Sequence, residues 1–124
     1  MADDAPIAPG SVSLVLPAYN GLEFTKGFLD SLREFSFYGL ELLLVNDASN
    51  DGTREYLTEL EFPGIRIMHN PVNIGYASSA NLGASMTTGE TICFLNNDLV
   101  LSKEWLVPML HGLQSLPDAG IVGC

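Results

Sequence analysis

The sequence predicts an α/β fold built on a doubly wound, mainly parallel sheet. From Ser11 onward, short apolar runs alternate with amphipathic stretches, and the connections between them are short. A chain with this alternation forms a parallel sheet, because each helix carries the chain back to the edge where the next strand starts. The 124 residues are 47% hydrophobic and 16% charged. They suit one domain with one core, which we assign to residues 11–124, after a disordered arm at residues 1–10.

Four apolar runs are expected to form strands. They cover residues 12–16, 41–45, 65–68 and 91–95, and the first of them stops at Pro17. The second and fourth runs have the continuous apolar pattern of strands that are buried on both faces. Residues 119–122 look like the start of a fifth strand, so we expect a sheet that is truncated after about five strands.

Helices are expected between the strands, at residues 22–35, 53–60 and 76–86. The first has an apolar face at helical spacing, made by Phe24, Phe28, Leu29, Leu32 and Phe35. The third is rich in small residues, which allow a helix to lie close to a sheet or to a ligand. A last helical stretch covers residues 102–116, with Ser102 as its N-cap. Pro108 inside that stretch should either kink the helix or start a second one.

The charge of the chain excludes several classes of function. It contains 15 acidic and 5 basic residues, which gives a formal net charge of −10. Nucleic acids and anionic membrane surfaces are bound mostly through Lys and Arg, so we expect neither as a partner. An acidic protein can still hold a diphosphate, provided that main-chain N–H groups or a bound cation supply the positive charge.

Other sequence features bear on location and chemistry. The two cysteines form no disulfide framework, no run of 18 apolar residues exists, and the acidic start is unlike a signal peptide. We therefore expect a cytoplasmic protein without a transmembrane segment, which reaches a membrane face only through parts not present here. The chain also lacks the G-x-G-x-x-G and P-loop motifs, a serine nucleophile elbow and zinc-ligand spacing.

Three polar segments follow the expected strands, at residues 17–20, 46–49 and 96–98. In an open parallel sheet, ligands bind beyond the carboxyl ends of the strands. Each segment alone is ordinary turn chemistry, but three of them at one crevice indicate a site. Asp98 is the strongest candidate, because a carboxylate at the crevice suits Mg²⁺ or Mn²⁺. Its alternative role is to cap the turn before Leu99.

The other candidates point to a nucleotide. Asp47 can accept a base N–H or a ribose hydroxyl, and Tyr19 offers a flat face for stacking; alternatively, Asp47 closes an Asx-turn with Ser49, and Tyr19 belongs to the core. Asn73 and Gly75 lead into the third helix, where N–H groups at a helix start attract phosphate. Gly75 has the alternative role of supplying a positive φ.

The ordered set of motifs resembles the family 2 glycosyltransferases, which have the Rossmann-like GT-A fold. The matching segments are VSLVLPAYN (12–20), LVNDASNDGT (44–53), NPVNIGYA (70–77), NLGA (81–84), TGE (88–90), FLNND (94–98), WL (105–106) and PDAGIVG (117–123). Single segments are weakly specific, whereas the complete order is highly specific. The match covers nearly everything from Ser11 onward.

The resemblance implies a site for a nucleotide-diphosphate sugar, linked to UDP, dTDP or GDP. It implies that Pro17, Ala18 and Tyr19 contact base and ribose, and that Asp47 reads the base. Asn96-Asn97-Asp98 matches the family's D-x-D-type motif, with Asp98 as the residue that binds the divalent cation. Asparagine at 96 and 97 removes charge from this motif, so cation affinity is expected to be weaker. The expected substrate-binding set is Pro17, Ala18, Tyr19, Asn20, Asp47, Asn73, Gly75, Asn96 and Asn97.

The resemblance also implies inverting transfer of a sugar to an acceptor hydroxyl, in cell-surface polysaccharide synthesis. In the family, the acceptor subsite and the catalytic base lie in the half that follows these motifs. We therefore expect a fragment that binds donor but lacks the base, and that forms homo-oligomers through the apolar surface left uncovered. Two alternatives are a non-catalytic nucleotide-binding or assembly module of the same fold and a sugar nucleotidyltransferase. A sugar nucleotidyltransferase needs a Gly-rich, Arg-containing turn after the first strand, and this sequence has residues 17–20 at that place instead.

Overall fold

A computed structural model describes residues 12–35, 40–101 and 105–115 and Gly120. In these ranges, four parallel strands form one sheet in the order β3-β2-β1-β4. The strands are Val12–Ala18 (β1), Glu41–Asn46 (β2), Ile65–His69 (β3) and Thr91–Phe94 (β4). The helices are Leu22–Phe35 (α1), Thr53–Glu59 (α2), Tyr76–Ser85 (α3) and Val107–Ser115 (α4). The arm at residues 1–10, the fifth strand and the N-cap at Ser102 lie outside the described residues.

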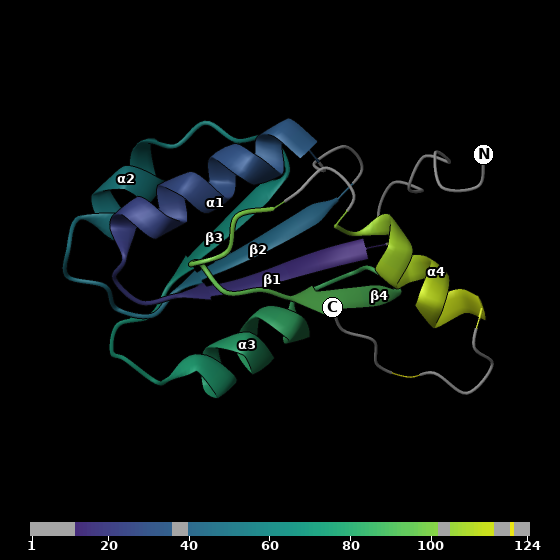
Figure 1. Cartoon of the computed structure of the whole chain (residues 1–124). Helices are drawn as coiled ribbons and strands as arrows, with labels where there is room; N and C mark the ends of the chain where they lie inside the picture. The colour runs from purple at the N-terminus through teal and green to yellow at the C-terminus, as the bar shows by residue number, and fades with distance from the viewer. Residues whose placement is uncertain (1–11, 36–39, 102–104, 116–119, 121–124) are drawn as a thin grey trace.

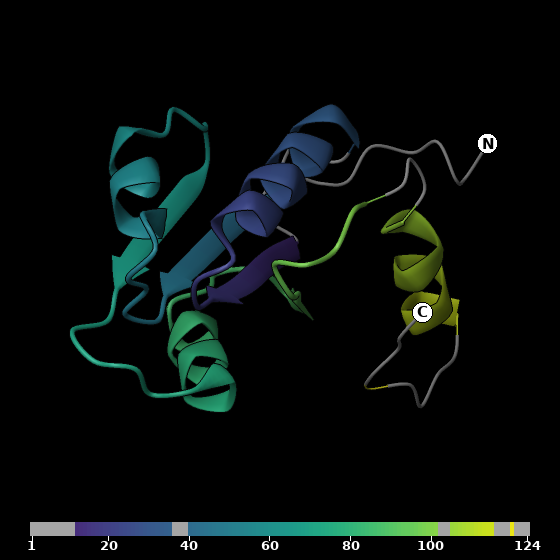
Figure 2. The same ribbon diagram turned by 60° about the vertical axis from the view of Figure 1, so that its left-hand side comes forward.

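The helices cover both faces of the sheet, which confirms the doubly wound prediction. Figures 1 and 2 show α1 and α2 over one face and α3 over the other, while α4 lies beyond the β4 edge. β1 is buried along its whole length and β2 along nearly all of it. The main core lies between these strands and α1, and its largest fully buried side chains include Phe28, Leu14 and Leu42. These layers place the loops after β1, β2 and β4 at one edge of the sheet.

The small residues of α3 allow it to lie close to the sheet, as expected. Gly83 is buried, and a Cβ atom at this position would lie 2.7 Å from Val15 Cγ1 and 3.3 Å from Val45 Cγ2. The 2.7 Å contact is shorter than real Cβ atoms show and the 3.3 Å contact is tight, because packed carbons prefer separations of about 3.5–4.0 Å. A glycine is therefore required where α3 crosses β1 and β2.

The prediction that Pro17 stops the first strand was wrong. β1 continues through Pro17 to Ala18, and these two residues pair with Val45 and Asn46 of β2. Proline is tolerated here because of the side to which its main-chain nitrogen points. In a strand, the N–H and C=O groups of successive residues point alternately to one neighbouring strand and to the other. The Val15 carbonyl, which accepts a bond from Leu95 N at 2.9 Å, faces β4, so Pro17 faces the same side. Pairing with β4 has ended at that point, and no ladder bond needs the missing N–H.

The expectation that β4 is buried on both faces was also wrong. Cys93 packs against the core, but its neighbours on the opposite face, Ile92 and Phe94, are 38% and 50% exposed. Among the described strands β4 is an edge strand, and α3 covers β1 and β2 instead. Phe24 is likewise 62% exposed, because the buried stripe of α1 runs through Thr25, Phe28, Leu29 and Leu32. Pro108 lies in the first turn of α4, so it starts a helix and does not kink one.

Candidate functional site

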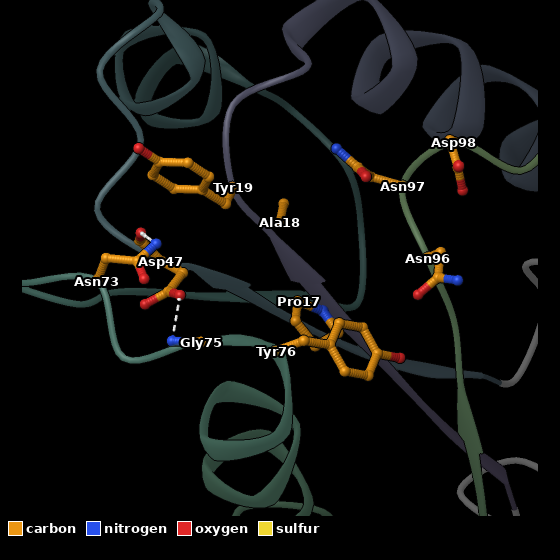
Figure 3. Close-up of a pocket in the computed structure, with 10 residues that line it drawn as sticks. All are labelled: Pro17, Ala18, Tyr19, Asp47, Asn73, Gly75, Tyr76, Asn96, Asn97 and Asp98. Atoms are coloured by element: carbon orange, nitrogen blue, oxygen red, sulfur yellow. Dashed lines mark hydrogen bonds between the residues drawn. The ribbon is translucent and has the colours of Figure 1, made fainter.

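The carboxyl ends of β1, β2 and β4 surround a pocket of about 450 Å³. Its lining consists of Pro17, Ala18, Tyr19, Asp47, Asn73, Gly75, Tyr76, Asn96, Asn97 and Asp98. Figure 3 shows Tyr19, Asp47 and Asn73 on one side, and Asn96, Asn97 and Asp98 on the other. The structure thus brings together every residue that the sequence placed at the site except Asn20, and it adds Tyr76. A pocket of this volume is in the usual range for small-molecule sites.

Asn20 holds the wall of the pocket without lining it. Its N–H donates to Ser49 Oγ at 2.8 Å, and its Oδ1 accepts from Asn50 N at 2.8 Å. These bonds join the loop after β1 to the loop after β2. Asn20 (φ 54°) and Ala48 (φ 61°) both have left-handed backbone conformations, which are uncommon for residues other than glycine. The role of Asn20 is to fix the turn that presents Tyr19.

Asp51 reinforces the same pair of loops. One of its carboxylate oxygens accepts from Leu22 N, at the start of α1, at 3.0 Å. The other accepts from Thr53 N at 3.1 Å and from Thr53 Oγ1 at 2.6 Å, at the start of α2. A carboxylate is favourable at the N-terminus of a helix. Burial raises the pKa of Asp51, but the hydrogen bonds from Thr53 and Leu22 outweigh it and lower the pKa below 3.8.

Asp47 is buried at the floor of the pocket and holds the loop before α3. Its carboxylate accepts from Ile74 N at 2.8 Å, from Gly75 N at 2.9 Å and from Asn70 Nδ2 at 3.0 Å. Ser49 N donates to Asn46 Oδ1, so the alternative of an Asx-turn between Asp47 and Ser49 is not what the structure contains. Burial raises the pKa of Asp47, but these hydrogen bonds outweigh it and keep the pKa below its ordinary value of 3.8.

These bonds also change the expected role of the α3 start. The N–H groups of Ile74 and Gly75 already bind the Asp47 carboxylate, so they are not available to a phosphate as the sequence suggested. Gly75 has φ 90° and ψ 166°, which supports its alternative role of supplying a positive φ. Asn73 Nδ2 donates to the Asp47 main-chain oxygen at 3.3 Å, and the Asn73 side chain lies at the pocket. The loop before α3 is thus held by the Asp47 carboxylate, an anion of the protein itself, and not by a bound phosphate.

The turn at residues 96–98 carries the candidate cation ligand. Asn97 Nδ2 donates to Asn20 O at 3.2 Å and to Thr25 Oγ1 at 3.1 Å, so this side chain ties the turn to the start of α1. Asn96 and Asp98 are exposed, and no hydrogen bond joins the Asp98 carboxylate to another described residue. Within the described ranges, no group of three His, Cys, Asp or Glu residues could hold a metal. One carboxylate and one amide oxygen fit Mg²⁺ or Mn²⁺ that keeps water and phosphate oxygens as its other ligands.

Tyr76, the first residue of α3, was not on the predicted list of site residues. Its hydroxyl donates to the main-chain oxygen of Leu95 at 3.2 Å, and its side chain is among those that line the pocket (Figure 3). Burial, and secondarily Cys93, raises the pKa of the Tyr76 phenol, so the hydroxyl stays protonated and donates at neutral pH. The sequence signal that could have identified Tyr76 as a site residue is an aromatic residue directly after Gly75 at the start of a helix.

Comparisons with known proteins place the chain in a family. The family model described as Glycosyl transferase family 2 matches residues 13–124. The amylovoran biosynthesis glycosyltransferase AmsB of Erwinia amylovora is 30% identical over 114 residues, which cover 89% of this chain and 38% of that protein. The hyaluronan synthase of Pasteurella multocida is 36% identical over 95 residues, covering 75% of this chain and 10% of that protein.

Two solved structures share the fold. The mannosyltransferase PcManGT from Pyrobaculum calidifontis, in complex with GDP-Man and Mn²⁺, has a TM-score of 0.71 and 22% identity, covering 88% of this chain and 36% of that one. Staphylococcus aureus TarS 1–349, in complex with UDP, has a TM-score of 0.68 and 20% identity, covering 91% and 38%.

The chain belongs to glycosyltransferase family 2 and has the GT-A, Rossmann-like fold. It spans about 38% of the length of the AmsB relative. No helix in the described ranges is long and apolar enough to cross a membrane.

Proposed function

We propose that this chain forms the donor-binding half of an inverting glycosyltransferase that takes a nucleotide-diphosphate sugar with a divalent cation. The observation that carries this proposal is that Tyr19, Asp47 and Asp98, from three different strand ends, line the same pocket. Pockets at this position in open α/β sheets are where ligands bind. The whole enzyme would then act in the cytoplasm, in the synthesis of a cell-surface polysaccharide.

The two sides of the pocket suit the two ends of the donor. Tyr19 is 51% exposed and offers a ring face to the base, beside the polar groups of Asn73 and the buried Asp47. Asn96 and Asp98, on the other side, offer oxygen ligands to Mg²⁺ or Mn²⁺. The lining contains no Lys or Arg, so a bound cation is the source of positive charge for a diphosphate. When bound, it would stabilise the departing diphosphate.

The comparisons support this donor class. The structural neighbours were solved with GDP-Man and Mn²⁺ in one case and with UDP in another, and the AmsB relative is named for amylovoran biosynthesis. We propose that the donor carries UDP, dTDP or GDP.

We propose that the acceptor is bound by a part of the enzyme that corresponds to the remaining length of the longer relatives. Inverting transfer needs a general base to deprotonate the acceptor hydroxyl as it attacks the anomeric carbon. In the described ranges the pocket carboxylates are Asp47, whose oxygens accept three internal hydrogen bonds, and Asp98, which we assign to the cation. We therefore propose that this chain binds donor without transferring the sugar.

Isothermal titration of the 124-residue chain tests the proposal. We expect heat of binding with at least one of UDP, dTDP and GDP when Mn²⁺ or Mg²⁺ is present, and weaker binding when EDTA removes the cation. Heat of the same size with and without cation would contradict the role of Asp98. No heat with any of the three nucleotides would favour a non-catalytic assembly module.

We also propose that the chain self-associates through the β4 edge. Ile92 and Phe94 are exposed there, and among the described strands none pairs with the outer edge of β4. An unpaired strand edge with apolar side chains promotes association. Light scattering should show a dimer or a larger oligomer that Ile92→Lys combined with Phe94→Lys converts to a monomer. Val72→Lys, on a loop away from β4, is the control, and a wild-type monomer at high concentration would refute the proposal.

A further inference from the structure

Tyr76 connects the two sides of the pocket. It is the first residue of α3, it is 49% exposed, and it lines the cavity between the nucleotide side and the cation side. Its hydroxyl reaches across to the main-chain oxygen of Leu95 at 3.2 Å. Because the acceptor is a main-chain atom, this bond depends on the tyrosine and on the path of the chain, and not on the side chain at position 95.

The α3 end of this connection is fixed. The N–H groups of Ile74 and Gly75, directly before Tyr76, donate to the buried carboxylate of Asp47 at 2.8 and 2.9 Å. The first main-chain bond of α3 runs from Ser79 N to Gly75 O at 3.0 Å. The backbone at Tyr76 is therefore anchored to the end of β2 through the buried carboxylate of Asp47.

The other end lies where the chain leaves the sheet. Leu95 N donates to Val15 O at 2.9 Å, which is the last bond from this strand to β1. The turn at residues 96–98 follows, and Asn97 ties it to Asn20 O and Thr25 Oγ1. The turn is thus held on the α1 side by Asn97 and on the α3 side by the Tyr76 hydroxyl. Asp98, which makes no hydrogen bond to another described residue through its carboxylate, takes its position from these two attachments.

We propose that Tyr76 is a positioning residue for the cation site. Its hydrogen bond to Leu95 O fixes the turn that carries Asp98 before the diphosphate and the cation arrive. A ligand group that is held in place beforehand loses less conformational freedom on binding, and this raises affinity. The inference rests on the proposed function for the identity of the ligand, but the attachment of the turn is a property of the chain alone.

Tyr76→Phe tests the inference because it removes the hydroxyl and keeps the ring. With Mn²⁺ present, we expect the affinity for the nucleoside diphosphate that the wild type binds to fall by roughly threefold to tenfold, as for one lost hydrogen bond. The affinity for the corresponding monophosphate, measured without cation, should not change. Tyr56→Phe, on α2 and outside the pocket lining, is the matched control and should alter neither value. A purely structural role for Tyr76 would lower both affinities alike.

Hydrogen exchange of the protein without ligand gives a second, independent measurement. In Tyr76→Phe, the main-chain amide of Leu95, which donates to Val15 O directly before the turn, should exchange faster than in the wild type, while the amides of β2 stay unchanged. Equal losses for the two nucleotides, or unchanged exchange of the Leu95 amide, would overturn the inference. If the wild type binds no nucleotide, the donor proposal fails, and the exchange rates still decide whether Tyr76 holds the turn.

Discussion

Replacing Asp98 by alanine should remove the cation-dependent part of nucleoside diphosphate binding. Asp98 is the pocket carboxylate that makes no hydrogen bond to another described residue, and the pocket lining contains no basic side chain. Without Asp98 the cation loses its charged protein ligand. The negative charge of the diphosphate is then less well neutralised in a protein whose own net charge is −10. In titrations with Mn²⁺, we expect the affinity to fall by at least roughly tenfold.

The matched control for this substitution is Asp30→Ala. It removes the same charge from an exposed site on α1 that does not line the pocket, so it should leave the affinity within about twofold of the wild type. Asp98→Asn keeps one oxygen ligand without the charge and should fall between the wild type and Asp98→Ala. A similar loss in Asp30→Ala and Asp98→Ala would mean that net charge, and not a cation site, governs binding.

Replacing Asp47 by alanine should destabilise the whole domain. Three donors, the N–H groups of Ile74 and Gly75 and the amide of Asn70, would lose a buried acceptor. A donor left without a partner in a buried place costs on the order of 1–3 kcal/mol. The bond from the Asn70 amide is buried, whereas those from Ile74 N and Gly75 N are partly buried, so water can partly replace them. We expect the free energy of unfolding in urea to fall by about 3 kcal/mol, with Asp30→Ala again as the control. A change below about 0.5 kcal/mol would show that the loop does not need this anchor.

The same carboxylate predicts how the effect depends on pH. The pKa of Asp47 is lower in the folded chain than its ordinary value of 3.8, so the folded state favours the charged form. The stabilisation is therefore complete above about pH 5, and it is lost as the pH falls through the folded-state pKa. The stability difference between the wild type and Asp47→Asn, measured in urea at several pH values, should narrow below about pH 4. A difference that does not change with pH would contradict the ionic role of Asp47.

The sequence predicted the elements well where local pattern decides the structure. The expected helix at residues 22–35 coincides with α1, and the end of each strand lies within two residues of the expected one. The errors came from the surroundings of a strand. Pro17 does not end β1 because β4 pairs only with the earlier part of that strand, and the apolar pattern of β4 could not reveal that no described helix covers Ile92 and Phe94. Strand order and the packing of layers decide both points.

The candidate site was predictable in its location but not in its internal bonds. Parallel strands bring their carboxyl ends to one edge, and this rule placed Tyr19, Asp47 and Asp98 together correctly. The bonds from Ile74 and Gly75 to Asp47 join residues 27 and 28 positions apart, and no local pattern indicates them. The bond from Tyr76 to Leu95 links α3 with the end of β4 in the same way. These long-range hydrogen bonds depend on which strands are neighbours in the sheet, and the local sequence pattern does not reveal that order.

The two walls of the pocket are connected to each other by hydrogen bonds. The loops after β1 and β2 are cross-linked by Asn20, Ser49 and Asp51, and Asp51 joins the starts of α1 and α2. These two loops therefore form one connected wall. The opposite wall, the turn at residues 96–98, is joined to it by the bond from Asn97 Nδ2 to Asn20 O, and the Tyr76 hydroxyl holds the start of that turn. The pocket is therefore one connected frame, and we expect a donor to bind without a large movement of either wall.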